Sequence, residues 1–140
     1  MAGSRFEGFN DRLMADFRAH RGKVTSGPFV GRDLLLLTTK GAKSGRERTT
    51  PLAYTRDGKR YVVVASKGGA PTNPAWYHNL RAHPAVTIEV GDKTLKAKAT
   101  PLTGAERRRL YDQHAVKLPA FSDYEKRTKR QIPVIVLDPE

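Results

Sequence analysis

The chain has 140 residues, and its 26 Lys and Arg against 14 Asp and Glu give a formal net charge of +12. With 38% apolar residues it can bury a core, so we expect a folded domain and not intrinsic disorder. The absence of cysteine excludes disulfides, thiol catalysis and cysteine-ligated zinc or iron–sulfur sites. The charge excess predicts an anionic partner, which is a nucleic acid, an acidic membrane face, or a small ligand with phosphate or carboxylate groups.

Residues 1–28 are predicted to form an amphipathic helix and a linker, and residues 29–140 the main domain. The apolar side chains of the helix recur at steps of three and four residues: Phe6, Phe9, Leu13, Met14 and Phe17. This face would either pack on the domain or rest on a membrane, and the acidic residues of the helix favour packing. No run is long enough to cross a bilayer and no signal peptide is recognisable, so we expect a cytoplasmic protein with at most peripheral contact with the inner membrane face.

The middle of the chain is predicted to be rich in strands. The run LLLLTT, starting at Leu34, indicates a buried strand, and β-rich runs on both sides of Asp57-Gly58 and of Gly91-Asp92 indicate two hairpins. A short helix is expected from Asn73-Pro74, with asparagine as the cap, to His83-Pro84.

Two helices and a last strand are expected at the C-terminal end. Thr103 and Ser122 each begin a segment with capping-box spacing, which predicts helices that end at about Lys117 and about Lys129. The segment IPVIVL then forms a strand. About six strands with short helices indicate an α+β domain built on an antiparallel barrel or sandwich.

The loop KGAKSGRER, between the first two predicted strands, combines cations with glycines. Its glycines expose backbone N–H groups, and the hydroxyls of Thr49 and Thr50 follow directly. The cations are Lys40, Lys43, Arg46 and Arg48. The loop is a candidate phosphate site, although not a Walker loop, and an ordinary basic hairpin loop is the alternative.

Two further segments are candidates for binding a flat ligand. The turn from Ser66 to Gly69 follows a hydrophobic strand, and its glycines either admit a ring close to the backbone or serve a tight turn. In NPAWYHNL, Trp76 and Tyr77 would either wall a ring-shaped ligand or pack in the core. Neither His78 nor His83 has a partner at metal-ligand spacing, so we expect no metal. Motifs of hydrolases are missing, and any enzymatic step is therefore expected to depend on a cofactor.

Three segments in this order resemble the deazaflavin-dependent nitroreductase family, actinobacterial oxidoreductases that use coenzyme F420: TTKGAKSGRERTTPLAY, VVVASKGGAPTNPAWYHNLRAHP and FSDYEKRTKRQIPVIVL. The resemblance covers roughly residues 30–138. It implies a split β-barrel similar to the FMN-binding barrel of pyridoxamine phosphate oxidases. It also implies a reductase that passes a hydride from reduced 8-hydroxy-5-deazaflavin to a quinone, a nitroaromatic compound, or an activated double bond in an enone or unsaturated lactone. The phosphate and glutamates of this cofactor would account for the positive charge.

The resemblance also assigns residues to the cofactor. The phosphate and the start of the tail would be held by Lys43, Ser44, Arg48, Thr49 and Thr50. The groove would be lined by Pro51, Leu52 and Tyr54. Along the ring would run Val64, Ala65, Ser66, Lys67, Gly68 and Gly69. The wall would be completed by Trp76, Tyr77 and Asn79.

Ser66 and Tyr124 are the candidate catalytic residues, as donors that stabilise the charge arriving on the acceptor. Leu118 and Phe121 stand where relatives active on bicyclic nitro-prodrugs carry tyrosines, which argues against reduction of such drugs. A quinone such as menaquinone would suit the apolar N-terminal helix.

Two other functions remain open on the sequence. The first is a barrel of the same fold that binds FMN, and the second is a basic barrel that binds nucleic acid without catalysis. A nucleic-acid barrel would interleave aromatic residues with its cations on an exposed strand face, whereas Trp76 and Tyr77 lie beside glycine-rich loops. We therefore expect no specific nucleic-acid partner.

Overall fold

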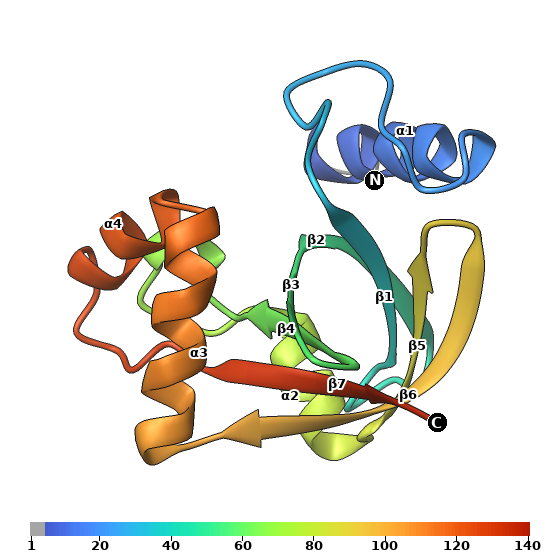
Figure 1. The fold of residues 1–140 in the computed structure, drawn as a ribbon. Coiled ribbons are helices and arrows are strands. Elements are labelled where there is room, and N and C mark those ends of the chain that lie inside the picture. Colours follow the sequence, from blue (N-terminus) through green and yellow to red (C-terminus); the bar gives the residue numbers. More distant parts are fainter. Residues whose placement is uncertain (1–4) are drawn as a thin grey trace.

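The computed structural model describes the backbone of residues 5–140 and the side chains of residues 8–140 (Figure 1). Its helices are α1 (Arg5–Ala19), α2 (Ala75–Ala82), α3 (Gly104–Lys117) and α4 (Ala120–Lys126), with the 3₁₀ turn η1 (Lys67–Gly69). Its strands are β1 (Leu34–Lys40), β2 (Glu47–Ala53), β3 (Thr55–Asp57), β4 (Arg60–Val64), β5 (Ala85–Val90), β6 (Lys93–Leu102) and β7 (Val134–Pro139).

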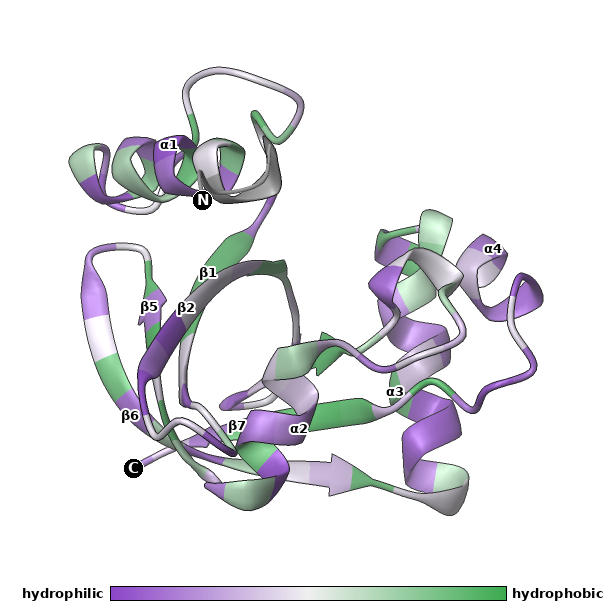
Figure 2. Ribbon diagram, turned by 180° about the vertical axis from the view of Figure 1, so that it is seen from behind, coloured by the Kyte–Doolittle hydropathy of each residue, from purple (hydrophilic) through white to green (hydrophobic). Residues whose placement is uncertain are grey.

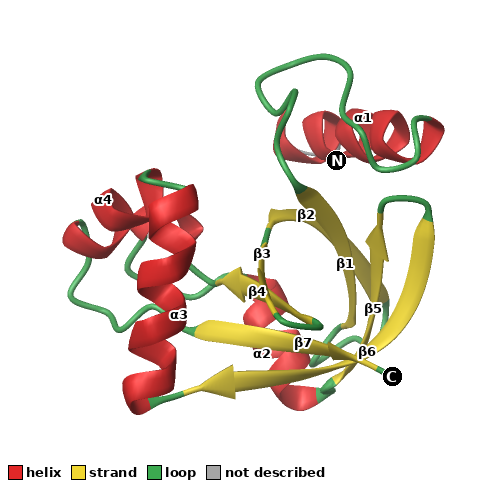
Figure 3. Ribbon diagram, viewed as in Figure 1, coloured by secondary structure: helices red, strands yellow, loops and turns green. Residues whose placement is uncertain are grey.

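The strands form one 7-stranded antiparallel sheet in the order β2-β1-β5-β6-β7-β4-β3 (Figure 3). The two edge strands, β2 and β3, are separated in the chain by Tyr54 alone. The sheet must therefore curl until its edges approach each other, which makes it a half-barrel and confirms the predicted antiparallel barrel architecture. About six strands were expected, because the run TTPLAYTR reads as one strand, whereas the corner at Tyr54 divides it into β2 and β3.

Strand β1 is buried on both faces, which explains its unbroken run of leucines. Leu35 and Leu37 belong to the core inside the barrel, whereas Leu34 and Leu36 contact α1 on the outside. Figure 2 shows the same pattern, with hydrophobic stretches on β1 and β7 and hydrophilic ones on α3.

The apolar face of α1 packs on the sheet. Leu13 and Phe17 are buried against β1, and Phe9 and Met14 pack around them. The side chain of Phe6 lies outside the described residues. Of the two uses predicted for this face, packing is therefore the one observed. None of the helices within residues 5–140 combines the length and the apolar character needed to span a membrane.

The far end of α1 is tied to the hairpin between β5 and β6. Arg18 donates two hydrogen bonds to the Glu89 carboxylate, at 2.9 Å from Nε and 2.8 Å from Nη2. Gly22 (φ 90°) lies so close to the hairpin that a Cβ there would clash with the Gly91 Cα. This close approach requires glycine at position 22.

Helices α3 and α4 cover the outer face of β4 and β7. The second core joins Leu110 and Tyr111 of α3 to alternate valines of the two strands: Val62, Val64, Val134 and Val136. Because inner and outer residues alternate along these strands, both are buried on two faces, as β1 is.

The predicted helix ends are correct in part. Helix α3 ends at Lys117 as expected, but the Thr103 side chain does not cap it. Helix α4 starts after Pro119 and ends at Lys126, so Ser122 lies inside it and the predicted end at about Lys129 is wrong. In α2, Pro74 and not Asn73 occupies the cap position. Both hairpins are present, with Gly58 and Gly91 in the left-handed region at φ 61°.

Candidate functional site

A groove of about 800 Å³ lies between the basic loop, β2 and α2. The loop and β2 contribute five residues assigned to the cofactor: Lys43, Ser44, Arg48, Thr49 and Thr50. Helix α2 contributes Trp76, His78 and Asn79. We call this space the cationic groove. Two segments that are far apart in the chain, and that were singled out separately in the sequence, therefore line one space.

The basic loop is arranged as an anion cradle. Two of its turns close through Gly41 N–H to Arg46 O, at 2.7 Å, and Gly45 N–H to Gly41 O, at 3.0 Å. The N–H groups of Lys43 and Ser44 donate to no acceptor within residues 5–140. Two free N–H groups beside a lysine and an arginine suit a phosphate oxygen.

The cations of the loop are not neutralised by the protein. Within the described part of the chain, no ion pair involves Lys40, Lys43, Arg46 or Arg48, and all four side chains are exposed. Their positive charge is thus available to a ligand in the groove or at its rim.

Asn79 fixes the loop on helix α2. Its Oδ1 accepts the N–H of Ala42 at 3.0 Å, and its Nδ2 donates to the Thr39 hydroxyl at 3.2 Å. The side chain is buried, so both of its polar ends are satisfied inside the protein. Asn79 therefore positions the cradle as well as lining the groove.

The turn after β4 has an unusual backbone. Lys67, Gly68 and Gly69 all lie in the left-handed region, at φ 49°, 65° and 83°. Ser66 is buried, and its side chain does not cap η1. The predicted positive-φ turn is therefore present, and lysine occupies one position where glycine would be unstrained. The lining of the cationic groove reaches Ala75 but does not include residues 66–69.

Tyr124 lines a second cavity of about 240 Å³, the α4 cavity. Its walls include Phe121 and Leu118 from the α4 region and Phe29, Leu34 and Ala53 from the barrel side. Those last three residues also line the α1 cavity, a third and mostly apolar space of about 450 Å³ under α1. The α4 and α1 cavities share one wall.

Two buried titratable groups lie behind the α4 cavity. His114 is fully buried, with Nδ1 hydrogen-bonded to the Thr55 hydroxyl at 2.9 Å and Nε2 without a partner among the side chains of residues 8–140 and the backbone of residues 5–140. Burial lowers the pKa of its imidazole to about 4. The Tyr111 hydroxyl donates to Phe121 O at 2.6 Å, and burial raises its pKa to about 12. Both groups are therefore neutral at pH 7.

The remaining residues assigned to the cofactor lie around these spaces. Pro51 faces the α1 cavity. Leu52, Tyr54 and Tyr77 are half-buried against the barrel core, and Val64 and Ala65 are buried where β4 ends. Between residues 5 and 140, no group of His, Asp and Glu is placed to hold a metal ion.

Two residues near these spaces were not predicted as part of a site. The sequence suggests only a metal-ligand role to test for His78, whereas the structure shows that this residue lines the cationic groove. Its place next to Trp76 and Tyr77 was a signal that could have pointed to the groove. Arg130 contacts the turn after β4, and no local pattern indicates this because more than 50 positions separate Arg130 from the turn.

Known proteins resemble this chain in sequence and in fold. Residues 11–139 match the family described as F420H(2)-dependent quinone reductase. An F420H(2)-dependent quinone reductase of Mycobacterium tuberculosis is 46% identical over 106 residues, which are 74% of this chain and 71% of that protein. A solved F420-H2 dependent reductase has a TM-score of 0.71 at 40% identity and covers 76% of this chain and 95% of its own. A candidate pyridoxamine 5′-phosphate oxidase from Listeria innocua, 13% identical with a TM-score of 0.54, covers 93% of this chain and 92% of its own and shares the fold.

Proposed function

The chain belongs to the F420H2-dependent quinone reductase family, and from that premise we propose how its residues hold the cofactor and the acceptor. It is an F420-dependent reductase, and coenzyme F420 is its cofactor. The observation that carries the proposal is the cationic groove, in which free cations and free backbone N–H groups lie next to the buried Trp76.

The residues of the groove fit this cofactor. Lys43, Arg48 and the N–H of Ser44 would hold the phosphate, and Trp76 would lie against the ring system. Micromolar binding needs about 8 kcal/mol, whereas an exposed ion pair contributes about 0.2 to 1 kcal/mol. Charge-assisted hydrogen bonds of about 1.5 to 3 kcal/mol and burial of the ring must therefore supply the rest. Added salt should weaken F420 binding without abolishing it.

Reduced F420, when bound, supplies a hydride. We propose that the protein's own residues hold the acceptor and stabilise the charge that arrives on it. Tyr124 lines the α4 cavity and would donate its phenolic proton in a hydrogen bond to an acceptor oxygen. The Ser66 hydroxyl, which caps no helix, would be the second donor. Apolar walls at Leu34 and Phe121 would exclude water.

We propose a quinone with an apolar tail, such as menaquinone, as the acceptor. Its head would occupy the α4 cavity, and its tail would follow the shared wall at Phe29 into the α1 cavity. Leu118 and Phe121 line this cavity without a hydroxyl, where relatives active on bicyclic nitro-prodrugs carry tyrosines. We therefore do not propose such drugs as acceptors. Smaller nitroaromatics and enones are proposed as secondary acceptors.

The packing of α1 on the sheet limits which residues could contact a membrane. The apolar face of α1 is already packed, so we place any peripheral contact at the exposed Phe29 and Val30 beside the cavities. We also propose that the chain divides at residue 28 into an N-terminal helical segment and the main domain. The α1 cavity, proposed to hold the quinone tail, would then have walls from both, because Leu13 and Leu34 line it.

The proposal is tested by fluorescence titration of the protein with F420, FMN and a random oligonucleotide. We expect saturable binding of F420 in the micromolar range or tighter, with much weaker binding of FMN and of the oligonucleotide at physiological salt. Tighter binding of FMN would favour the flavin barrel, and tighter binding of the oligonucleotide would favour the nucleic-acid barrel. Either result would contradict the proposed site.

Ser66→Ala is expected to slow hydride transfer by roughly 10-fold, because one hydrogen bond to the acceptor contributes up to about 1.5 kcal/mol. Cofactor affinity should change little, since the proposed phosphate ligands lie elsewhere in the site. Single-turnover oxidation of the reduced cofactor gives the rate, and fluorescence titration gives the affinity. Tyr124→Phe is the matched variant for the second donor. Equal losses of rate and affinity in Ser66→Ala would assign Ser66 to binding alone.

A further inference from the structure

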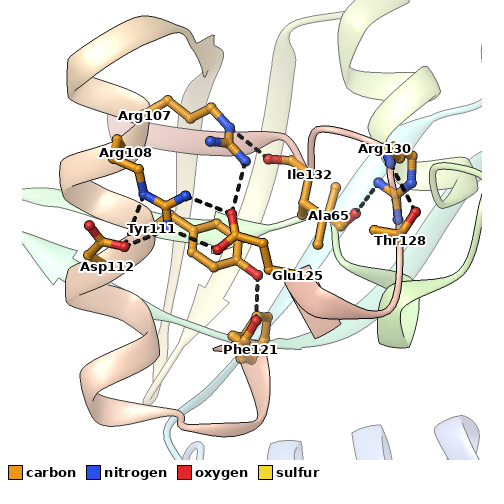
Figure 4. Close-up of polar contacts among 10 residues, drawn as sticks. All are labelled: Ala65, Arg107, Arg108, Tyr111, Asp112, Phe121, Glu125, Thr128, Arg130 and Ile132. Carbon is orange, nitrogen blue, oxygen red and sulfur yellow. Dashed lines mark hydrogen bonds and ion pairs between the residues drawn. The ribbon is translucent and has the colours of Figure 1, made fainter. Parts of the chain in front are cut away.

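Arg130 lies between α4 and β7, and its side chain reaches the loop that follows β4; Figure 4 shows its contact with Ala65. Nη1 donates to Ala65 O at 3.1 Å and to Asn73 Oδ1 at 2.5 Å. Nη2 donates to Ser66 O at 2.8 Å and to Ala70 O at 2.9 Å, and Nε donates to Ala70 O at 3.1 Å. A guanidinium has five N–H groups, and every one of them is used on this loop.

The contacts of Arg130 use its geometry and not an opposite charge. All of its acceptors are neutral carbonyl or amide oxygens, and no ion pair within residues 5–140 includes it. A lysine at this position would keep the charge but could not span the same acceptors, because its donors share one nitrogen. The planar fork is therefore the property that this position requires.

The loop is in a conformation that needs such a restraint. Lys67 has φ 49°, a region that costs a residue with a Cβ about 1 kcal/mol or more. On its other side the loop is wedged against α4, because a Cβ on Gly69 would lie 2.8 Å from both Tyr124 O and the Arg127 Cβ. Arg130 and the end of α4 thus hold the loop between them.

Helix α4 is itself fixed from its far side, as Figure 4 shows. Arg108 of α3 donates to both carboxylate oxygens of Glu125, at 2.7 Å and 3.0 Å. Tyr111 donates to Phe121 O at 2.6 Å. The helix that carries Tyr124 is therefore held against α3, and Arg130, which follows this helix in the chain, holds the Ser66 loop.

We propose that Arg130 is a positioning residue of the reductase. Through the carbonyls of Ala65, Ser66 and Ala70 it holds the Ser66 turn in register with Tyr124, so that the two donors act on the same acceptor. This inference rests on the proposed function, in which Ser66 and Tyr124 face the acceptor. A misplacement of about 1 Å in such a site can cost about 100-fold in rate.

The experiment compares Arg130→Lys, Arg130→Gln and Arg130→Ala with the wild type, and Lys129→Gln is the control for the loss of one charge at a neighbouring exposed position. We expect all three Arg130 variants to lower the single-turnover rate by about 10- to 100-fold. The Kd of F420 from fluorescence titration should change only a few-fold. Methylguanidinium, but not methylammonium, should restore much of the rate of Arg130→Ala. Amide hydrogen exchange within residues 65–73 should accelerate in all three variants without any cofactor.

A wild-type rate in Arg130→Lys, or equal rescue by methylammonium, would overturn the proposal, because charge alone would then suffice. A rate that falls only in proportion to F420 affinity, or to a lowered Tm, would overturn it as well. F420 binding by the wild-type protein distinguishes these results from a failure of the proposed function, because the wild type would then not bind F420. Hydrogen exchange at residues 65–73 needs no cofactor, so it tests whether Arg130 holds this loop even if the protein does not bind F420.

Discussion

Arg48→Glu is expected to weaken F420 binding by more than about 100-fold without changing the fold. Arg48 is exposed, forms no ion pair within residues 5–140, and lines the cationic groove with Lys43. The substitution removes a charge-assisted hydrogen bond of about 1.5 to 3 kcal/mol and adds repulsion of the cofactor phosphate. Fluorescence titration gives the affinity, and thermal unfolding should show an unchanged Tm.

Arg46→Glu is the matched control. Arg46 belongs to the same loop and is equally exposed, but it does not line the groove. The reversal of its charge should cost only a few-fold, and added salt should remove most of that loss. Equal losses in the two variants would mean that the loop attracts the cofactor at a distance without contacting it. An unchanged affinity in Arg48→Glu would exclude this residue from the site.

His114 is expected to make the stability of the protein depend on pH between 6.5 and 4. Burial holds the pKa of its imidazole at about 4 in the folded state, against 6.5 for an exposed histidine. Below pH 6.5 the unfolded chain binds a proton that the folded chain does not bind. The free energy of unfolding therefore falls as the pH is lowered, until the folded state also takes up the proton near pH 4. The full loss is about 3 kcal/mol.

The measurement is urea unfolding of the wild type and of His114→Asn at several pH values. An asparagine can still form a hydrogen bond with the Thr55 hydroxyl, as Nδ1 of His114 does, but it does not titrate. The variant should lose about 3 kcal/mol less than the wild type between pH 7 and pH 4. Carboxylates with a lowered pKa, such as that of Asp57 beside Arg60, affect both proteins alike and cancel in the difference. Parallel stability profiles would show that His114 takes up its proton in the folded protein as readily as in the unfolded chain.

The parts of the fold that were predicted correctly depend on chemistry within a few residues. The leucine run of β1 and the glycine turns at Gly58 and Gly91 are local signals, and all three are present. The errors lie where packing competes with a local motif. The spacing from Ser122 indicated a helix cap, but α4 starts after Pro119, and the chain bends at Tyr54 because the sheet curls there.

The candidate site divides in the same way. Its basic loop was recognisable from the chain alone, because cations, glycines and hydroxyls within a short stretch are enough to make an anion cradle. Three other features arise only when distant segments pack together. They are the hydrogen bond that joins this loop to Asn79 of α2, the apolar cavities beside α1 and α4, and the hydrogen bonds of Arg130 to the Ser66 turn. Such contacts depend on the curvature of the sheet and on the placement of helices, and no short sequence pattern encodes either one.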